Sequence, residues 1–568
     1  MTVSGGTSSW WRGLDEPPIL LAPPFPGSND IQLTVPLAAD SRPASEEEAA
    51  ALIDAMRRLR VGGTFWAKRP ALPEMPHIIA RPSSPAQARA MLEQSERSGI
   101  ATLFWFPTEM AARSIDAEGM AALIGACDPW HIFSRTKQIW ADANDDIALL
   151  ASMARCGLRT FGDGPYATLN NGTDQDVLAA VRSELLNKYG FIEPFHQRAA
   201  SAAEIVQLLG QWRTLIDSNK QIGAVYGVAF WKRGSVDPLL WNGEGPVSFN
   251  SATSEALQQA DSAKAMAIWK ARVPADFLAQ AEQSGSPLLE IEDGFIRSAG
   301  LGADCVPPLS IVVDGLCAHY DPSGPSGLEN LLVKGDFPPE LLRRAEELRQ
   351  LIVSTGISKY AVGNAIHQRR GGDRKHILVT GQVEDDRSVL KGGGEVKSNL
   401  DLLHRVRTLE PKAYIIYRPH PDVDAGHRKG HIPDAQALTL ANEIAREAPI
   451  TALIDMADHV HVLTSLVGFE ALIRGKSVTT HGVPFYAGWG LTTDLGPVPA
   501  RRNAERSLTE LIAATLLLYP RYLDPLTGLP CPPEVLIERL AAGVKKENSV
   551  IVLLRRLQGT LMRTMKGF

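Results

Sequence analysis

Short apolar runs alternate with amphipathic stretches along most of this chain. The apolar runs are rich in Val, Ile, Leu and aromatic residues, which predicts strands at residues 101–106, 223–231, 287–291, 309–313, 376–380, 413–417 and 459–463. Apolar positions three and four residues apart predict helices at residues 46–59, 85–97, 338–354, 399–408, 438–447, 466–474 and 508–519. Strands that alternate with helices are typical of parallel sheets covered by helices, so we expect an α/β fold.

Changes in composition divide this pattern into domains. Residues 1–50 are rich in Pro, Ser and Gly and predict an irregular arm. A polar run at 197–203 and a charged, glycine-rich run at 368–375 are typical of connections between domains. We therefore expect three α/β domains, at 51–198, 199–375 and 376–545, and a basic tail at 546–568. A cleft that binds a small ligand is expected between the last two domains.

A weak internal repeat changes the interpretation of the first of these domains. Residues 78–85 resemble the stretch that begins at Ile415, and residues 162–167 resemble residues 482–487, in the same order. The first copy lacks the histidine and the Thr-Ser pair of the second. We interpret residues 51–198 as a decayed copy of one α/β half, with chance similarity between two α/β layers as the alternative.

Composition narrows the class of protein. The chain has 568 residues, 44% of them hydrophobic and 21% charged, the balance of a globular protein that can bury a large core. The net charge of −6 argues against a nucleic-acid partner. The five cysteines form no CxxC pair, which suggests reduced thiols. With no signal-peptide pattern and no long apolar window, we expect a cytoplasmic protein or one peripheral on the inner membrane.

Carboxylates end the strand predicted at 287–291. Glu292 and Asp293 follow its apolar residues directly, and then come a glycine, an aromatic residue and Arg297. Open α/β sheets place their sites at the carboxyl ends of strands, where a side chain is held rigidly. The alternative is a strand followed by an ordinary polar turn.

Two further strand ends carry groups that suit a phosphate. Gln382 and Asp385 follow one strand, and the glycines at 392–394 come shortly afterwards; such glycines can turn backbone amides toward a phosphate. Arg418 and His420 end the next strand, with the histidine held between two prolines. The alternatives are a flexible surface loop and a surface histidine in a proline turn.

A fourth strand end combines hydroxyls with the start of a helix. Thr464 and Ser465 lie where helix 466–474 begins, so they can cap its amides or hold a phosphate, and Glu470 could reach a ribose. The bland interpretation is a simple N-cap with an acidic first turn. The aromatic, glycine-rich loop at 481–490 could close over a base or sugar, or pack between domains. Without a Ser/His/Asp arrangement or a metal-ligand cluster, the four strand ends favour a two-domain enzyme that uses a nucleotide sugar.

The same residues resemble a known family. Six motifs resemble those of bacterial capsule-polysaccharide β-Kdo transferases, where Kdo is 3-deoxy-D-manno-oct-2-ulosonic acid. They are Glu292–Ser298, Pro307–Ser310 with His319–Asp321, Gly381–Asp386, Tyr417–Asp422, Thr464–Glu470 and Pro484–Gly490. The resemblance covers about residues 220–540. It implies two Rossmann-like domains in a GT-B-like arrangement and a CMP-β-Kdo donor. It also implies retention of anomeric configuration and a lipid-linked or saccharide acceptor, with no cofactor. Known members with two complete modules differ from this chain, which has one complete module preceded by a degenerate α/β domain.

The resemblance also assigns roles to residues. It makes Asp293 the nucleophile, and Glu292 either a structural anchor or an acid/base, depending on whether the strand has already turned. Arg297 would pair with a carboxylate, for instance that of Kdo itself, and His420 with Arg418 would bind or protonate the departing CMP phosphate. The remaining contacts to the donor would come from Thr464, Ser465, Glu470, Gln382 and Asp385. No metal is expected, because CMP is already a good leaving group.

Two other classes of function stay open at this point. One is a non-catalytic partner in capsule assembly or export, built on a worn transferase fold. The other is a nucleotide-sugar epimerase or hydrolase of similar build. Counted from Lys545, the tail has six basic residues and one acidic residue among its leucines and methionines, and it could dock on an anionic membrane or pack on the protein.

Overall fold

The computed structural model describes residues 19–28, 31–37, 41–113, 121–298, 306–358, 367–426 and 428–544. The predicted tail at 546–568 lies outside these residues. The chain forms two compact units, Met1–Gln221 with Leu240–Val247, and Ile222–Leu239 with Ser248–Phe568. We describe each unit by itself.

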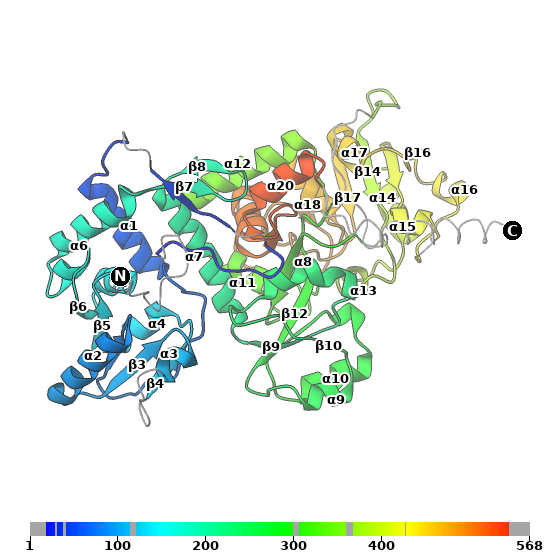
Figure 1. The fold of residues 1–568 in the computed structure, drawn as a ribbon. Helices are drawn as coiled ribbons and strands as arrows, with labels where there is room; N and C mark the ends of the chain where they lie inside the picture. Colours follow the sequence, from blue (N-terminus) through cyan, green and yellow to red (C-terminus); the bar gives the residue numbers. More distant parts are fainter. Residues whose placement is uncertain are drawn as a thin grey trace. The chain divides into compact units, whose positions relative to one another are not determined.

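The first unit contains a five-stranded parallel sheet with the order β4-β3-β2-β5-β6 (Figure 1). Its strands are β2 (Ile78–Arg81), β3 (Thr102–Phe106), β4 (Ala122–Ile124), β5 (Gln138–Asp142) and β6 (Gly157–Phe161). The strands read as continuous apolar runs because both faces of a parallel sheet are covered. One face buries Phe104 and Trp140 against Met91 of α2 (Pro85–Ser98), and α5 (Asp146–Met153) follows β5.

Helix α7 (Ala202–Asn219) extends the first unit beyond the boundary expected at residue 198. Its apolar face, which includes Leu209 and Trp212, is buried, and it packs on α1 (Glu46–Leu59). Arg213 of this helix also donates to Asp128 at 2.8 Å. Buried packing therefore holds α7 to the first unit, and the polar run at 197–203 contains strand β8 (Arg198–Ala200) and the start of α7 within that unit. Part of the expected arm is ordered as well, because β1 (Thr34–Pro36) pairs with β7 (Tyr189–Glu193), whose other neighbour is β8.

The second unit contains two sheets. The first has seven strands in the order β10-β9-β11-β12-β13-β20-β21. They are β9 (Ile222–Tyr226), β10 (Phe249–Asn250), β11 (Ala265–Ile268), β12 (Leu288–Asp293), β13 (Ser310–Asp314), β20 (Arg521–Leu523) and β21 (Pro530–Cys531). Strands β20 and β21 return to this sheet after the chain has built the second sheet. The segment from 521 to 531 thus belongs to the first sheet, although its place in the sequence suggested the second.

The second sheet has six parallel strands in the order β16-β15-β14-β17-β18-β19. They are β14 (His376–Thr380), β15 (Tyr414–Arg418), β16 (Glu443–Ile444), β17 (His459–Val462), β18 (Ser477–Thr480) and β19 (Thr493–Asp494). The helix predicted at 438–447 is wrong. Asn442 and Ala445 donate backbone hydrogen bonds to β15 instead, because pairing at the sheet edge outweighs helix propensity.

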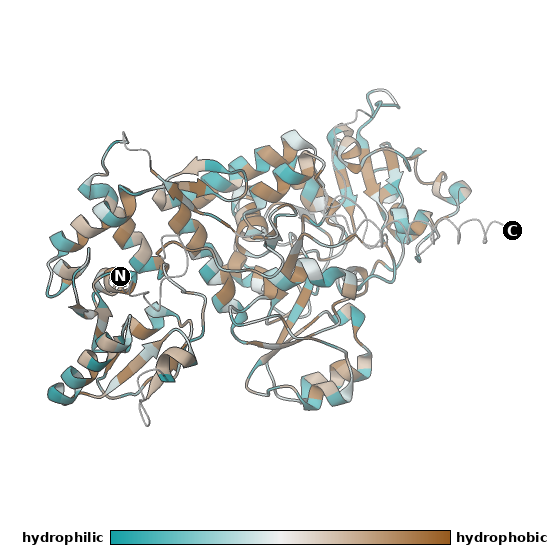
Figure 2. Cartoon of the chain, in the orientation of Figure 1, coloured by the Kyte–Doolittle hydropathy of each residue, from teal (hydrophilic) through white to brown (hydrophobic). Residues whose placement is uncertain are grey.

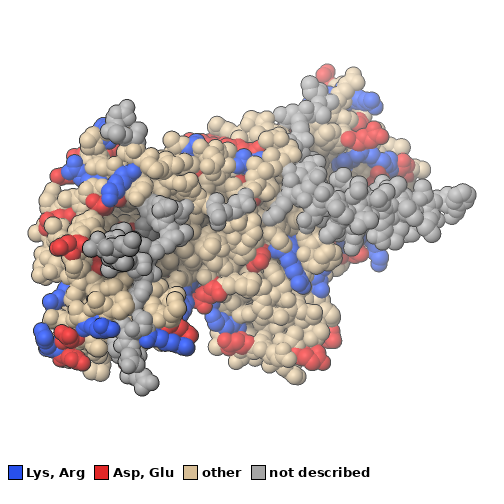
Figure 3. All heavy atoms as spheres, viewed as in Figure 1, with Lys and Arg blue, Asp and Glu red and all other residues tan. Residues whose placement is uncertain are grey.

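Figure 2 shows apolar residues concentrated in the strands, with hydrophilic residues on the outer faces of the helices. On the face drawn in Figure 3, positive and negative side chains are interspersed. Within the described part of the chain, no helix combines the length and apolarity needed to cross a bilayer. The second unit has one mixed sheet, parallel from β10 to β12 and antiparallel from β12 to β21, and one fully parallel sheet. With the smaller α/β unit that precedes them, they confirm the predicted fold class of two Rossmann-like domains.

Candidate active site

A pocket of about 650 Å³ lies at the carboxyl ends of β12, β14, β15 and β17. The lining includes most of the residues that the sequence singled out, which are Glu292, Asp293, Gln382, Arg418, His420, Thr464, Ser465 and Glu470. Arg297 and Asp385 do not line it. The structure therefore gathers into one cavity four strand ends that are widely separated along the chain.

Asp293 is the last residue of β12 and pairs with Ile311 of β13, so the segment is still extended when it reaches the pocket. Its Oδ2 accepts a hydrogen bond from Arg297 Nε at 2.8 Å, and its Oδ1 lies 3.3 Å from Lys232 Nζ. The side chain stays 26% exposed toward the pocket. Two cations thus orient the carboxylate without covering it.

Arg297 pairs with a carboxylate, as the sequence suggested, and the partner in this structure is Asp293. The guanidinium is buried, and besides Asp293 it donates to Ser298 Oγ at 2.8 Å and to the Val306 carbonyl at 3.0 Å. These bonds direct Arg297 into the protein behind Asp293. Its role in this structure is to position the carboxylate, and it is not part of the pocket wall that a substrate would meet.

Glu292 differs from Asp293 in its electrostatic surroundings. Burial, together with the negative charges of Asp293 and Glu290, raises the pKa of Glu292 to about 8. Glu290 itself is satisfied by Lys270 at 2.9 Å and by the Tyr320 hydroxyl at 2.9 Å. A carboxyl group whose pKa burial raises in this way is a candidate acid/base. The strand has not turned at Glu292, the case in which the sequence argument made this residue an anchor, yet both Glu292 and Asp293 line the pocket at the end of β12.

His420 is held in a defined tautomeric state. It caps the short helix α15 (Pro421–Asp424), and its Nδ1 accepts the Asp422 amide at 3.2 Å. The neutral ring therefore carries its proton on Nε2. Arg418, at the end of β15, donates to the Ala445 carbonyl at 2.8 Å and lines the same pocket. Together these groups can donate to a phosphate.

Gln382 connects two strand ends. Its Oε1 accepts the Thr464 amide at 2.8 Å and its Nε2 donates to Thr464 Oγ1 at 3.0 Å, so it fixes the loop between β17 and α18 (Val467–Ile473). Ser465 Oγ accepts the Val467 amide at 3.3 Å at the start of that helix. Asp385 instead pairs with Arg428 at 2.9 Å, and the neighbouring Asp386 lines the pocket.

The aromatic loop at 481–490, after β18, lines the pocket and also packs against neighbouring segments. The Phe485 ring lies 4.9 Å from the Phe295 ring, which links the loop to the segment after β12. Tyr486 donates its hydroxyl hydrogen to the Ser465 carbonyl. Arg502 donates to the carbonyls of Pro484 at 2.7 Å and Ala487 at 2.9 Å. These contacts make the loop a fixed wall.

Sequence reasoning missed three residues. Tyr320 and Arg387 line the pocket, with Arg387 Nη1 3.4 Å from the Tyr320 hydroxyl. Lys232, on α8 (Phe230–Leu240), is buried beside Asp293. The only signal for Lys232 is a lysine that follows two aromatic residues after a strand. Among the residues that the structure describes, no group of three or more His, Cys, Asp and Glu side chains could hold a metal ion.

Comparison with known proteins places this site in context. Residues 265–522 match the model of a family described as capsule polysaccharide biosynthesis protein. The capsule polysaccharide modification protein LipA of Neisseria meningitidis serogroup A is 41% identical over 357 residues, which cover 62% of this chain and 50% of LipA. The lipopolysaccharide-processing protein LpsZ of Rhizobium meliloti is 43% identical over 272 residues, 47% of this chain and 62% of LpsZ.

A solved structure of Thermosulfurimonas dismutans KpsC, a β-Kdo 2,7 transferase, is 35% identical and has a TM-score of 0.45; the match covers 56% of this chain and 98% of that one. The chain spans about half the length of LipA. The six motifs quoted from the sequence all fall within the residues that the family model matches. Through residues 265–522 the chain belongs to the capsule polysaccharide biosynthesis protein family.

Proposed function

We propose that the chain is a retaining glycosyltransferase that moves Kdo from CMP-β-Kdo to a glycolipid or saccharide acceptor in capsule or surface polysaccharide biosynthesis. One observation carries the proposal: a carboxylate oriented by two cations, Asp293, lies in the same pocket as a phosphate-binding set that includes His420 and Arg418. The choice of Kdo as the sugar rests on the motif resemblance.

The first step would form a covalent intermediate. An Asp293 oxygen attacks the anomeric carbon while the bond from that carbon to the CMP phosphate oxygen breaks, and the electron pair leaves with CMP. CMP departs as an anion, so no proton transfer is required. His420 donates a hydrogen bond from Nε2 to the departing phosphate, and Arg418 supplies positive charge.

The second step would transfer the sugar. The acceptor hydroxyl oxygen bonds to the same carbon, Asp293 leaves as a carboxylate, and the hydroxyl proton goes to Glu292. While Asp293 is an ester, one of the two charges that raise the pKa of Glu292 is absent. Glu292 then releases its own proton to solvent, and the resulting carboxylate accepts the proton of the acceptor hydroxyl. Two displacements at one carbon retain its configuration. The scheme uses no metal, and we expect the same turnover in EDTA as in buffer.

A second candidate is a non-catalytic partner in capsule assembly or export. The observation that favours it is the double ion pair of Asp293, which also suits a purely structural carboxylate. Either function could involve an acceptor lipid or capsule assembly proteins at the inner membrane.

Incubation with CMP-Kdo separates these candidates. We expect CMP release that depends on acceptor, and an intact protein whose mass rises by one Kdo residue, mapped to the peptide that contains Asp293. The Asp293→Asn variant should show neither result. Near-normal turnover by that variant would exclude Asp293 as the nucleophile, and no CMP release by the parent chain with any acceptor would favour the non-catalytic candidate.

A further inference from the structure

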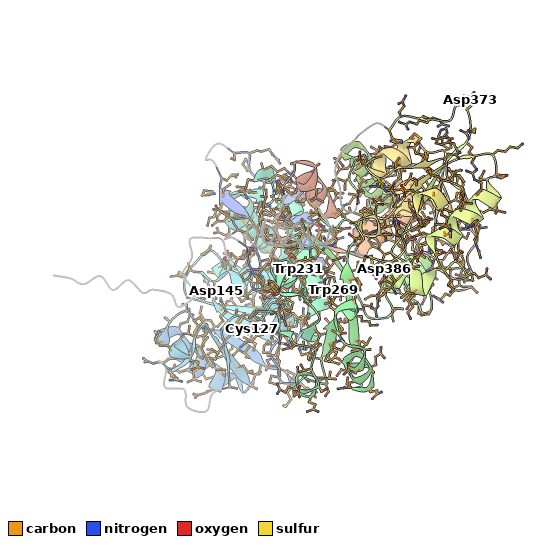
Figure 4. The ribbon with its side chains drawn as sticks, turned by 90° about the vertical axis from the view of Figure 1, so that its right-hand side faces the viewer. Cys127, Asp145, Trp231, Trp269, Asp373 and Asp386 are labelled. Carbon is orange, nitrogen blue, oxygen red and sulfur yellow. The ribbon has the colours of Figure 1, made fainter. Side chains whose placement is uncertain are left out.

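Lys232 occupies an unusual position for a lysine. Its side chain is only 6% exposed, and Nζ lies 3.4 Å from the centre of the Trp269 ring and 5.4 Å from that of Trp231. Figure 4 labels the two tryptophans, which come from α8 and from the end of β11 and lie close to each other. Nζ also lies 3.3 Å from Asp293 Oδ1. An ammonium group is thus held between aromatic faces and aimed at the proposed nucleophile.

The charge balance around Asp293 is specific. Two buried cations, Lys232 and Arg297, contact one carboxylate, while the neighbouring Glu292 is protonated near neutral pH. In the covalent intermediate of the proposed function, Asp293 becomes an uncharged ester. Arg297 keeps its bonds to Ser298 and Val306, but Lys232 loses the carboxylate that it pairs with. A buried charge left without a counterion is strongly unfavourable.

A donor sugar can remove this cost if it brings its own anion to the correct place. A 2-ulosonic acid carries a carboxylate directly on its anomeric carbon, one bond of about 1.5 Å away from the carbon that Asp293 attacks. That carboxylate can pair with Lys232 as the charge of Asp293 disappears. An ordinary aldose has hydrogen at this position and leaves Lys232 unpaired.

We infer that Lys232 is a specificity-determining residue that selects donors with a carboxylate on the anomeric carbon by exchanging its ion pair from Asp293 to that carboxylate. The inference deepens the proposed function and depends on it. Burial lowers the pKa of Lys232 to about 8, which agrees with an ammonium that stays charged only while an anion lies beside it. Asp293, Arg297 and Glu292 are the charged or titratable groups that act on it most strongly.

The test compares CMP-Kdo with its carboxamide analogue, in which the sugar carboxylate is replaced by an uncharged amide of nearly the same shape. For the parent chain, we expect kcat/KM to be at least about 100-fold higher for CMP-Kdo. Lys232→Met should reduce this preference to about tenfold or less, whereas Lys232→Arg should keep most of it because the charge remains. Lys270→Met is the matched control: Lys270 also pairs with a buried carboxylate, that of Glu290 at 2.9 Å, but not with Asp293, so the preference should stay at the parent value.

Each outcome decides the matter. Equal use of the two donors by the parent chain would overturn the inference even if Lys232→Met does not fold. A Lys232→Met protein that retains the parental preference would overturn it as well. No turnover of CMP-Kdo by the parent chain would instead overturn the proposed function, and this inference with it.

Discussion

Two parallel sheets in this molecule share a strand order but carry different groups at the ends of their central strands. In the first unit the order is β4-β3-β2-β5-β6, and in the second sheet of the second unit it is β16-β15-β14-β17-β18, with a further strand, β19, at the edge. In both, the chain starts at a central strand, moves outward on one side and then continues on the other side of that strand. Ligands of open α/β sheets bind where the direction changes, at the carboxyl ends of the two central strands. The two units therefore offer equivalent places for a ligand.

The contents of the two places are not equivalent. In the first unit Arg81, at the end of β2, donates to Asp145 at 2.6 Å, and its guanidinium lies 4.3 Å from the centre of the Trp105 ring. Figure 4 marks Asp145 at this position. In the second unit Gln382 and Thr464 occupy the corresponding strand ends and bind each other beside an open pocket. Topology provides the location of a site, but the polar groups there decide whether a ligand can use it.

The largest expected effect is on turnover, and it distinguishes Asp293 of the second unit from Asp145 of the first. Asp293→Asn should lower turnover of CMP-Kdo by at least about three orders of magnitude, roughly 4 kcal/mol of activation free energy, because the amide is a poor nucleophile. CMP release measures this effect. Asp145→Asn, the matched change in the first unit, should leave turnover of the folded protein within about threefold of the parent value. Equal losses in both variants would mean that Asp293, too, acts through stability.

The same Asp145→Asn variant should unfold more easily. It leaves Arg81 buried beside a neutral partner, which should lower the free energy of unfolding of the first unit by about 3 kcal/mol. Denaturant titration followed by tryptophan fluorescence checks this value. Replacing both partners, as Arg81→Met with Asp145→Leu, should restore most of the stability. A double variant as unstable as the single one would contradict the interpretation that this ion pair has only a packing role at the strand ends.

His420→Ala should reduce turnover of CMP-Kdo by about 100-fold, since a phosphate loses one well-oriented donor. A rise in the Kd for CMP would be the equivalent result if the histidine acts mainly in binding. His404, exposed on α14 (Asn399–Leu409), provides the control, and His404→Ala should change neither quantity. Unchanged turnover and CMP affinity in His420→Ala would leave the residue only its structural role as the cap of α15.

The sequence predicted the strand ends of these two sheets unequally well. Strands such as 376–380 and 459–463 are continuous apolar runs, and the structure brings the polar residues that follow them into one pocket. The internal repeat aligned residues 78–85, which include β2, with the stretch from Ile415, which is β15. In the strand orders of the two sheets, however, β2 takes the central position that β14 takes in the other sheet. An apolar strand that ends in Arg-Pro is too general a pattern to fix which strand corresponds to which.

Residues whose role depends on distant partners were beyond sequence reasoning. Lys232 is defined by Asp293, 61 residues further along the chain. The role of Arg297 changed for the same reason, because only the fold shows that Val306 and Ser298 accept its remaining hydrogen bonds. Pattern locates the ends of strands, but burial and long-range pairing assign the work of each side chain there.

The smallest predicted effect concerns two carboxyl groups, Glu292 in the second unit and Asp146 in the first, that burial keeps protonated to higher pH. Burial raises the pKa of Glu292 to about 8 from 4.5 and that of Asp146, at the start of α5, to about 6 from 3.8. The unfolded chain binds fewer protons than the folded one between the two pKa values of each group, so stability falls as pH rises through that window.

Glu292→Gln removes this loss and should stabilise the second unit by about 2 kcal/mol at pH 8, less than the full pKa difference implies because the pocket is open to water. Asp146→Asn should gain only about 1 kcal/mol in the first unit, and both gains should vanish below about pH 4. Thermal unfolding of each variant across this range is the measurement; a gain that does not change with pH would show that packing, and not the bound proton, distinguishes these carboxyl groups.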